Sequence, residues 1–337
     1  MQMTRQAEAA ELKGMAGGFW IAQCLSVAVT LKIADYLKDG PKSSDQLAVL
    51  TACHAPALSR FLRALSSLGL LKHDQSDCFA LTPLSDLLRT DAEGSVYAEL
   101  RHVLNASNWL TWGQLIHSVR TGEAAFPEVF GKDVWSYRAE HSEANAIFDQ
   151  MATAKSKEQA DLIDHIDFSG VRTIADIGGG NGALLVEILR RQPDCRGILF
   201  DQPHVVDPAS ELALSSKVAD RFSIVPGDFF EAVPEGCDLY LLKAILHNWN
   251  NEAAVHILRN CRKAMSPAGR ILLMELVLEP SQSSFESFMD LHMLVVHGGQ
   301  ERTAADFRML MNAAGFELTG IAKAENGISV LQGMPSG

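Results

Sequence analysis

From Val171 onward, short apolar runs alternate with amphipathic stretches, and this alternation limits the possible folds more than any other feature. The runs with the length and residue types of strands are residues 173–177, 197–200, 222–225, 239–242, 270–276 and 317–322. Most of the stretches between them have helical spacing, which is the pattern of parallel strands joined by crossover helices. We therefore predict a Rossmann-like, doubly wound and mostly parallel α/β sheet over residues 169–337.

A glycine-rich segment, residues 176–182, follows the first of these runs and precedes an apolar helix. Glycine allows the chain to turn sharply and a ligand to approach the backbone closely. Read through Gly178, Gly180 and Ala183, the segment fits the dinucleotide fingerprint as well as an S-adenosylmethionine site. The carboxylate of Asp176 favours S-adenosylmethionine, because it attracts an ammonium and a sulfonium and repels a pyrophosphate.

Two further acids stand at the ends of the next two predicted strands. Asp201 is placed to bind ribose hydroxyls, and Asp228 is placed to accept from an adenine amino group while Phe229 packs on the ring. A strand-end cap and a turn aspartate beside a core aromatic are the plain structural alternatives. Ligands of open α/β sheets gather at the carboxyl ends of strands, which favours the binding interpretation.

Residues 1–100 have a different texture, in which helices precede two short strands. The sequence predicts a helix ending near Ala52, a second helix from Pro56 to Gly69, a polar turn at 74–77 between the strands, and a helix from Pro83. This is the winged-helix pattern. Acidic residues outnumber Lys and Arg here and the whole chain carries a net charge of −12, so we expect no nucleic-acid partner. The module is predicted to pair two subunits or to cover a pocket.

The most apolar N-terminal stretch, residues 19–31, contains Gln23, Ser26 and Thr30 and follows acidic residues. It lacks the basic start of a signal peptide and is too short to cross a bilayer, so we predict a buried helix, no membrane partner and a cytoplasmic protein. The six cysteines show no paired spacing, so we expect no metal site.

Residues 101–168 are predicted to be connecting helices that contribute to an acceptor pocket. Five large side chains are candidates to contact the acceptor: Trp109, Phe148, Met151, Met289 and Met293. The unbranched thioether of methionine adapts to flat aromatic faces. An ordinary core or an apolar helix stripe would produce the same pattern.

With these motifs, the chain resembles the class I S-adenosylmethionine-dependent O-methyltransferases of the caffeate, hydroxyindole and bacterial natural-product type, including enzymes that tailor phenazines or polyketides. The resemblance covers nearly the whole chain. It rests on the winged-helix pattern and on residues 176–182, Asp201, 227–230, 243–249, Glu275 and 298–303.

The resemblance implies roles for single residues. Contacts to the methyl donor fall to Gly178, Gly180, Asp201, Asp228, Phe229 and Lys243. His247 becomes the general base, and Glu275 and Glu301 are the two acids beside it. The family forms homodimers through residues equivalent to 1–100 and needs no metal. The expected reaction is methyl transfer to a hydroxyl group of a small aromatic acceptor.

One residue departs from the family pattern, in which an aspartate usually follows the histidine. Here the residue is Asn248, which removes a charge that could stabilise an imidazolium. This departure leaves open a relative that binds S-adenosylmethionine but catalyses another reaction, such as hydroxylation or rearrangement. A nicotinamide-dependent oxidoreductase and a ligand-sensing winged-helix regulator are the remaining alternatives. With an ordinary pKa near 6.5, histidine would accept a phenol proton at a cost of about 5 kcal/mol.

Overall fold

The structure, a computed structural model, describes residues 5–206, 209–281, 283–323 and 327–337. Its contacts divide the chain into two compact units, Met1–Trp109 and Leu110–Gly337. The expected connecting helices therefore fall largely within the second unit. The three-segment division at residues 100 and 168 stays a prediction.

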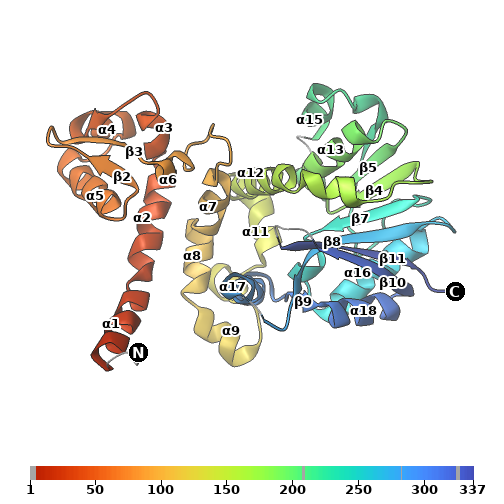
Figure 1. Ribbon diagram of the computed structural model, residues 1–337. Helices are drawn as coiled ribbons and strands as arrows, with labels where there is room; N and C mark the ends of the chain where they lie inside the picture. Colours follow the sequence, from red (N-terminus) through yellow and green to blue (C-terminus); the bar gives the residue numbers. More distant parts are fainter. Residues whose placement is uncertain (1–4, 207–208, 282, 324–326) are drawn as a thin grey trace. The chain divides into compact units, whose positions relative to one another are not determined.

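The first unit is helical with a small antiparallel sheet (Figure 1). Its helices are α1 (Arg5–Ala16), α2 (Gly18–Thr30), α3 (Ile33–Leu37), α4 (Ser44–Thr51), α5 (Ala55–Ser67), α6 (Pro83–Asp86) and α7 (Tyr97–Val103), and α8 (Ala106–Trp112) crosses the division between the units. Its strands are β1 (Lys42–Ser43), β2 (Leu71–His73) and β3 (Cys78–Leu81) in the order β1-β3-β2. Ser43 caps α4 in a capping box with Gln46, which fixes the start of the helix that the sequence predicts to end near Ala52.

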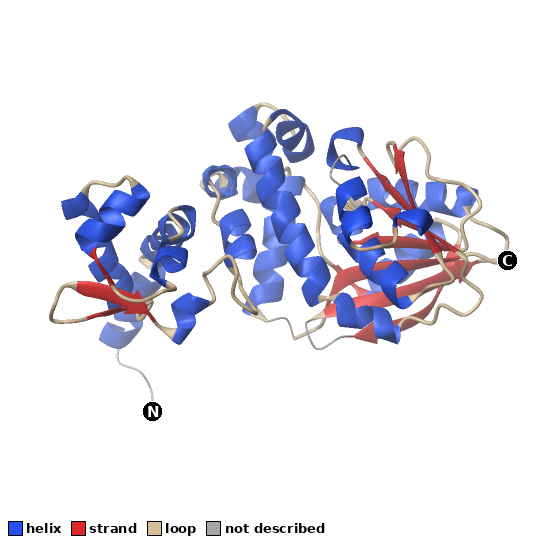
Figure 2. Cartoon of the chain, turned by 90° about the horizontal axis from the view of Figure 1, so that it is seen from above, coloured by secondary structure: helices blue, strands red, loops and turns tan. Residues whose placement is uncertain are grey.

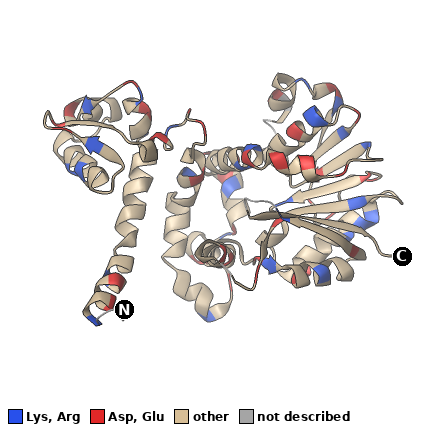
Figure 3. Cartoon of the chain, viewed as in Figure 1, with Lys and Arg blue, Asp and Glu red and all other residues tan. Residues whose placement is uncertain are grey.

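Helix α2 corrects one expectation, because residues 19–31 form a helix that the chain itself does not bury. Only Ala28 and Val29 of α2 are buried, whereas Phe19 is 52% and Trp20 is 67% exposed. Figure 3 shows that α2 carries no charged side chain. An apolar helix without a polar face is normally buried, so the single chain leaves an apolar surface uncovered here.

The second unit contains the predicted sheet, with the strand order β10-β11-β8-β7-β4-β5-β6. The strands are β4 (Thr173–Ile177), β5 (Arg196–Asp201), β6 (Phe222–Pro226), β7 (Leu239–Lys243), β8 (Arg270–Leu278), β10 (Phe316–Lys323) and β11 (Ile328–Pro335), and β9 (Arg302–Thr303) pairs with β8 beside this path. Strands β4 to β8 run parallel, and β10 and β11 add antiparallel pairs. The predicted fold class is confirmed.

Helices cover both faces of this sheet (Figure 2). The helices packed against its two cores are α13 (Ala183–Arg191), α14 (Pro203–Val206) and α15 (Ala209–Ser215) on one face and α16 (Asn251–Ala264) and α18 (Ala304–Ala313) on the other. The other helices of this unit are α9 (Leu115–Thr121), α10 (Phe126–Phe130), α11 (Val134–Glu140), α12 (Ser142–Glu158) and α17 (Ser284–His292). Shorter turns are η1 (Ala160–His165), η2 (Ala219–Arg221), η3 (Leu246–Asn248) and η4 (Met293–His297), the last being π-helical.

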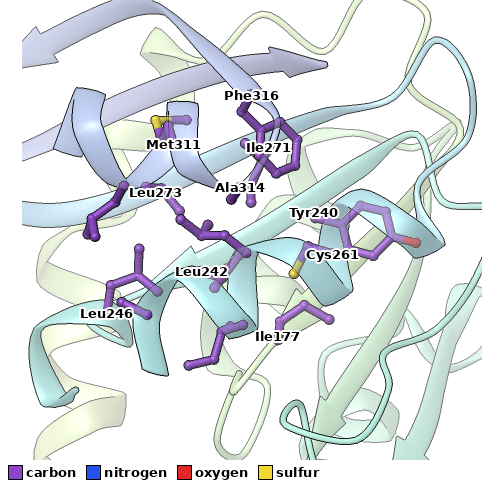
Figure 4. Packing of buried hydrophobic residues seen from close by; sticks show 14 of the residues in the cluster. Ile177, Tyr240, Leu242, Leu246, Cys261, Ile271, Leu273, Met311, Ala314 and Phe316 are labelled. Carbon is purple, nitrogen blue, oxygen red and sulfur yellow. The ribbon is translucent and has the colours of Figure 1, made fainter. Parts of the chain in front are cut away.

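The alternation of side chains along the central strands builds a core on each face. Leu242 and Leu273 belong to the cluster packed with α16 and α18, part of which Figure 4 shows. Leu241 and Leu272, one residue earlier on the same strands, belong to the cluster packed with α13. Strands buried on both faces read as continuous apolar runs, which is why the sequence predicts them well.

The topology places two loops side by side at one edge of the sheet. From β4 the chain winds outward through β5 and β6, and it then returns to β7 on the other side of β4. Neighbouring parallel strands whose following loops diverge form a switch point, where ligands of α/β sheets bind. The loops after β4 and β7 are the glycine segment and the His247 segment.

Candidate active site

The glycine segment after β4 needs glycine for two separate reasons. Gly178, Gly180 and Gly182 have positive φ angles of 70°, 63° and 80°. A Cβ atom at Gly178 would lie 2.4 Å from Cδ1 of Ile245 in the loop after β7, so the two loops are in contact. A Cβ atom at Gly180 would meet nothing within 4 Å. The segment is therefore tightly packed at its start and open at Gly180.

Asp176 lies directly below this segment and is 1% exposed. Its Oδ2 atom has no hydrogen-bond partner among the described residues. Burial raises the pKa of Asp176 to about 7, against the opposing positive charge of Lys243. Lys243, at the end of β7, is itself partly buried, and burial lowers its pKa. A further positive charge next to Asp176 would stabilise the ionised form of this buried carboxyl group.

Asp201 at the end of β5 connects its strand to the glycine segment. Its Oδ2 accepts from the backbone N–H of Gly180 at 2.8 Å, and its Oδ1 accepts from that of Gln202 at 2.7 Å. Burial raises the pKa of Asp201. Each carboxylate oxygen retains a further lone pair, so these bonds leave room for two hydroxyl donors.

Asp149 on α12 is an acid that sequence reasoning missed. Burial raises its pKa to about 6, and the charge of Asp201 acts in the same direction. On the same helix, Thr153 accepts a hydrogen bond from the side chain of Asn181 in the glycine segment. The sequence around Asp149 does not mark this acid as a ligand contact, and only its tertiary surroundings reveal it.

Asp228 and Phe229 follow β6. Oδ1 of Asp228 accepts from the backbone N–H of Phe230 at 2.8 Å, which stabilises the turn. The ring of Phe229 lies edge-on to Trp249 at 6.0 Å and close to the position of a Cβ atom on Gly178. Phe229 therefore lies at the switch point, while the proposed contacts of both residues to adenine stay predictions.

His247 lies in η3 just after β7, between two acids from other segments. Its Nδ1 atom lies 2.9 Å from Oε1 of Glu301 and 3.9 Å from Oε2 of Glu275. The imidazole is 16% exposed, and the two carboxyl groups are 1% and 0% exposed. Burial opposes the charge of the imidazole, but Glu301 and Glu275 outweigh it and raise the pKa of His247 to about 9.

Backbone N–H groups hold the carboxylate of Glu275, and the side chain of Asp290 holds the backbone of Glu301. Oε1 of Glu275 on β8 accepts from the N–H groups of Ile245 and Leu246 at 3.1 and 2.8 Å. The N–H of Glu301 donates to Oδ1 of Asp290 at 2.8 Å. Glu275 and Glu301 follow His247 in the sequence by 28 and 54 residues, and the fold brings them together. Only the family resemblance therefore predicts their place beside His247.

Arg302 fixes the loop that carries Glu301. The guanidinium is 1% exposed and donates to the carbonyl groups of Leu246 and Trp249, at 2.7 Å each, and to Oδ1 of Asn251 at 3.0 Å. Every one of these acceptors belongs to the segment around His247. The sequence motif contained Arg302, but its positioning contacts become visible only in the structure.

Asn248 turns away from the imidazole. Its side-chain amide donates to the carbonyl oxygens of Ala244 and Ile245 at 2.9 and 3.3 Å, and the residue is buried. An aspartate could not donate these bonds. The negative charges that act on His247 therefore come from Glu301 and Glu275, and Asn248 does not deprive it of them.

Aromatic rings from α8, α11, α12, α17, η4 and the turn after η3 form a cluster close to His247. The ring of Trp135 on α11 has three neighbours, Phe148 at 5.8 Å, Trp249 at 6.4 Å and His297 at 5.3 Å. Nε1 of Trp112 donates to Nδ1 of His292 at 2.9 Å, and His292 in turn lies 6.4 Å from His297. We refer to these six residues, Trp112, Trp135, Phe148, Trp249, His292 and His297, as the aromatic cluster.

The candidate acceptor residues are distributed unevenly around this cluster. Phe148 belongs to it. Met151 and Met289 lie partly buried on α12 and α17, and Met293 is buried at the start of η4. Trp109 belongs to the first unit, whose position relative to the second is not determined, so its role stays a prediction.

Comparison with known proteins identifies both units. Residues 112–317 match the O-methyltransferase domain and residues 14–91 match the O-methyltransferase dimerisation domain. The chain is 41% identical to the phenazine O-methyltransferase of Lysobacter antibioticus, over 95% of this chain and 94% of that protein. The structure of mitomycin 7-O-methyltransferase matches with a TM-score of 0.94 at 33% identity and covers 98% of this chain and 99% of its own.

A further solved structure carries ligands. It is an O-methyltransferase from neocarzinostatin biosynthesis in complex with S-adenosylmethionine and 2-hydroxy-5-methyl naphthoic acid. It matches with a TM-score of 0.85 at 28% identity and covers 94% of this chain and 96% of its own. The family resemblance that the motifs indicated is confirmed.

Gly299→Ala should disturb the active site from a distance. A Cβ atom at Gly299 would lie 2.1 Å from the carbonyl oxygen of His247 and 2.8 Å from the backbone nitrogen of Trp249, and backbone cannot move aside cheaply. We expect turnover to fall by about 10²-fold, since a displacement near 1 Å has this effect. Gly320→Ala, where a Cβ atom meets nothing within 4 Å, is the matched control. Steady-state kinetics and thermal unfolding of both variants test the expectation, which fails if Gly299→Ala keeps the wild-type rate.

Proposed function

Because the chain belongs to the O-methyltransferase family, we propose that it transfers the methyl group of S-adenosylmethionine to a hydroxyl group of a small aromatic acceptor, with His247 as the general base. The observation that carries this proposal is the imidazole of His247, held between two buried carboxylates beside the glycine segment.

The residues around the glycine segment suit the methyl donor. The unpartnered Oδ2 of Asp176 and the raised pKa values of Asp176 and Asp149 call for a positively charged ligand, and S-adenosylmethionine carries an ammonium and a sulfonium. Asp201, Asp228, Phe229 and Lys243 would complete the binding site together with Gly178 and Gly180. When bound, the donor supplies an electrophilic methyl group.

The aromatic cluster supports a flat, aromatic acceptor. Aromatic side chains present large apolar faces and edges against which another flat ring packs favourably. The neocarzinostatin relative holds a naphthoic acid and the Lysobacter relative is named for phenazines, so both relatives point to the same class of acceptor. We propose that Phe148, Met151, Met289 and Met293, with Trp109 from the first unit, contact it.

The chemistry assigned to His247 follows from its surroundings. A base with a pKa of about 9 accepts a proton from a phenol of pKa near 10 at a cost of about 1.4 kcal/mol, compared with about 5 kcal/mol for an ordinary histidine. Glu301 holds Nδ1, which leaves Nε2 to take the proton of the acceptor hydroxyl as that oxygen attacks the methyl carbon. Glu275 and Glu301 then stabilise the imidazolium, as the carboxylate does in a hydrolytic triad.

Reactions other than methyl transfer lose their main support. The alternative of hydroxylation or rearrangement rested on Asn248, whose side chain bonds to its own turn while two other acids serve His247. The expected independence from metals stays a prediction, because ligand atoms of His247, Glu275 and Glu301 lie within 4.8 Å of one another and could hold an ion.

His247→Ala should separate donor binding from catalysis. Because the imidazole is proposed to act on the acceptor, affinity for S-adenosylmethionine should change less than twofold in calorimetry. Loss of a positioned base should lower kcat by about 10²- to 10⁴-fold, equivalent to about 3 to 5 kcal/mol. His165→Ala, at an exposed histidine of the same unit, is the control. Transfer of labelled methyl groups to 1-naphthol at the wild-type rate by His247→Ala would exclude the base assignment.

The pH profile should report the raised pKa of the base. In the free enzyme His247 is protonated below a pKa of about 9, so log kcat/KM should rise with pH and level off above that value. Glu301→Gln removes one of the charges that raise this pKa, so its inflection should move to lower pH. A flat profile between pH 6 and 9, or an inflection that Glu301→Gln leaves in place, would contradict this account.

The apolar surface of α1 and α2 supports a homodimer. One helical segment among the described residues, Arg5–Thr30, is long and apolar enough to cross a membrane by length and composition alone. Residues 14–91 match the dimerisation domain, so we propose that a second copy covers this surface. A cytoplasmic location without membrane or nucleic-acid partners stays a prediction.

Trp20→Glu should weaken this association, because it places a charge on an apolar side chain that is 67% exposed in the single chain. Light scattering of the wild type at micromolar concentration should give a dimer, and the variant should shift toward monomer. Leu214→Glu, at a residue 68% exposed in the second unit, should leave the dimer intact. A fully active monomeric wild type would refute the proposal.

A further inference from the structure

Arg138 on α11 is buried but incompletely bonded. The residue is 6% exposed, and its Nη1 atom has no hydrogen-bond partner among the described residues. Its guanidinium carbon lies 3.9 Å from the ring centre of Phe148 and 4.9 Å from that of Trp135. The guanidinium is thus held in a defined position by two members of the aromatic cluster, while donors of its planar fork stay available.

A second buried arginine in the same unit shows what a structural role looks like. Arg302 is 1% exposed and directs its donors to three carbonyl groups and a side-chain amide oxygen. A buried donor without a partner is costly, so an arginine that only supports the fold is expected to be satisfied in this way. Arg138 differs, which indicates that its partner is not part of the described chain.

The charges around Arg138 do not supply that partner. Burial lowers its pKa to about 9, so it remains a cation near neutral pH, and Asp149 acts on it through charge without a hydrogen bond. Oδ2 of Asp149 accepts from the side chain of Asn145. Burial, with the charges of Arg138 and His247 acting in the same direction, lowers the pKa of His292 to about 4 and keeps that ring neutral.

The position of Arg138 relates it to the catalytic histidine. Trp135, which the guanidinium overlies, stacks on Trp249, and Trp249 comes two residues after His247. The charges of Arg138 and His247 both reach His292. The guanidinium and the proposed base therefore belong to one region, lined by the rings that we assign to the acceptor.

We propose that Arg138 binds a carboxylate of the acceptor, so that the substrate is a hydroxylated aromatic acid. This inference rests on the proposed function. The planar guanidinium matches a carboxylate in a bidentate pair, and such charge-assisted bonds strengthen where water is excluded. The carboxylate would satisfy the donors that the chain leaves open, and the pair would orient the ring so that its hydroxyl faces His247.

The test measures binding without requiring turnover. Calorimetry compares the wild type with Arg138→Gln, using benzoate, 1-naphthoate and anthracene-1-carboxylate, each against its primary amide. For the acid whose ring fits, the wild type should bind the acid at least tenfold more tightly than the amide, about 1.4 kcal/mol. In Arg138→Gln this preference should fall below twofold, while the amide binds as before. Arg120→Gln, at an exposed arginine of the same unit, should retain the full preference.

Two results would overturn the inference. One is a wild type that binds no acid more tightly than its amide, a measurement that needs no variant. The other is a folded Arg138→Gln that weakens acid and amide equally, since this indicates a structural role. If Arg138→Gln does not fold by circular dichroism, Arg138→Lys replaces it and should show a reduced preference, because it keeps the charge but loses the fork.

Calorimetry and the methyl-transfer assay together distinguish this inference from the proposed function. Methyl transfer to 1-naphthol without any preference for acids would leave the methyltransferase activity standing and remove the role of Arg138. An acid preference that depends on Arg138, with no methyl transfer to any hydroxylated acid, would support the role of Arg138 in binding and contradict the methyltransferase activity.

Discussion

The contact between His247 and the carboxylates of Glu301 and Glu275 is the interaction on which the rest of the site depends. Two acids that are 1% and 0% exposed would be unfavourable neighbours without a positive charge between them, and the imidazolium provides it. The raised pKa of His247 has a consequence for stability. The stabilisation is complete below the ordinary pKa near 6.5 and is lost as the pH rises through about 9. The arrangement that makes this histidine a strong base therefore makes its neutral form the less stable one.

The sheet topology allows this arrangement, because it places the donor site and the base on neighbouring strands. β4 and β7 pair in parallel, and the loops after them touch through Gly178 and Ile245. Glu275 comes from β8, the next strand, and reaches back to the backbone of the His247 loop. Arg302 then ties the Glu301 loop to the same backbone. Three segments that are distant in sequence thus share one set of hydrogen bonds, and the glycine segment packs against the same loop.

Sequence alone predicts what depends on local pattern. The central strands are apolar on both faces, and the sequence predicts them within a few residues. It does not predict β11, which mixes polar and apolar residues. The sequence predicts the helix at residues 19–31 correctly, but the prediction that this helix is buried is wrong for the single chain, because periodicity does not reveal what covers a surface. Asp149 and Arg138 escaped prediction for a related reason. Each has the sequence neighbours of an ordinary helix residue. The pKa of each is shifted because the fold buries it among segments that are distant in sequence.

The charges around the glycine segment distinguish between the two ligands that this segment could bind, S-adenosylmethionine and a dinucleotide. On the side of the glycine segment, Asp149, Asp176 and Asp201 all have raised pKa values, chiefly because they are buried. The charge of Asp201 raises the pKa values of the other two further, so Asp201 repels both Asp149 and Asp176. A dinucleotide would add the negative charge of a pyrophosphate to this repulsion, whereas an ammonium and a sulfonium relieve it. Asp176, which first distinguished the two ligands in the sequence, therefore belongs to a group of three acids whose common preference is for a cation.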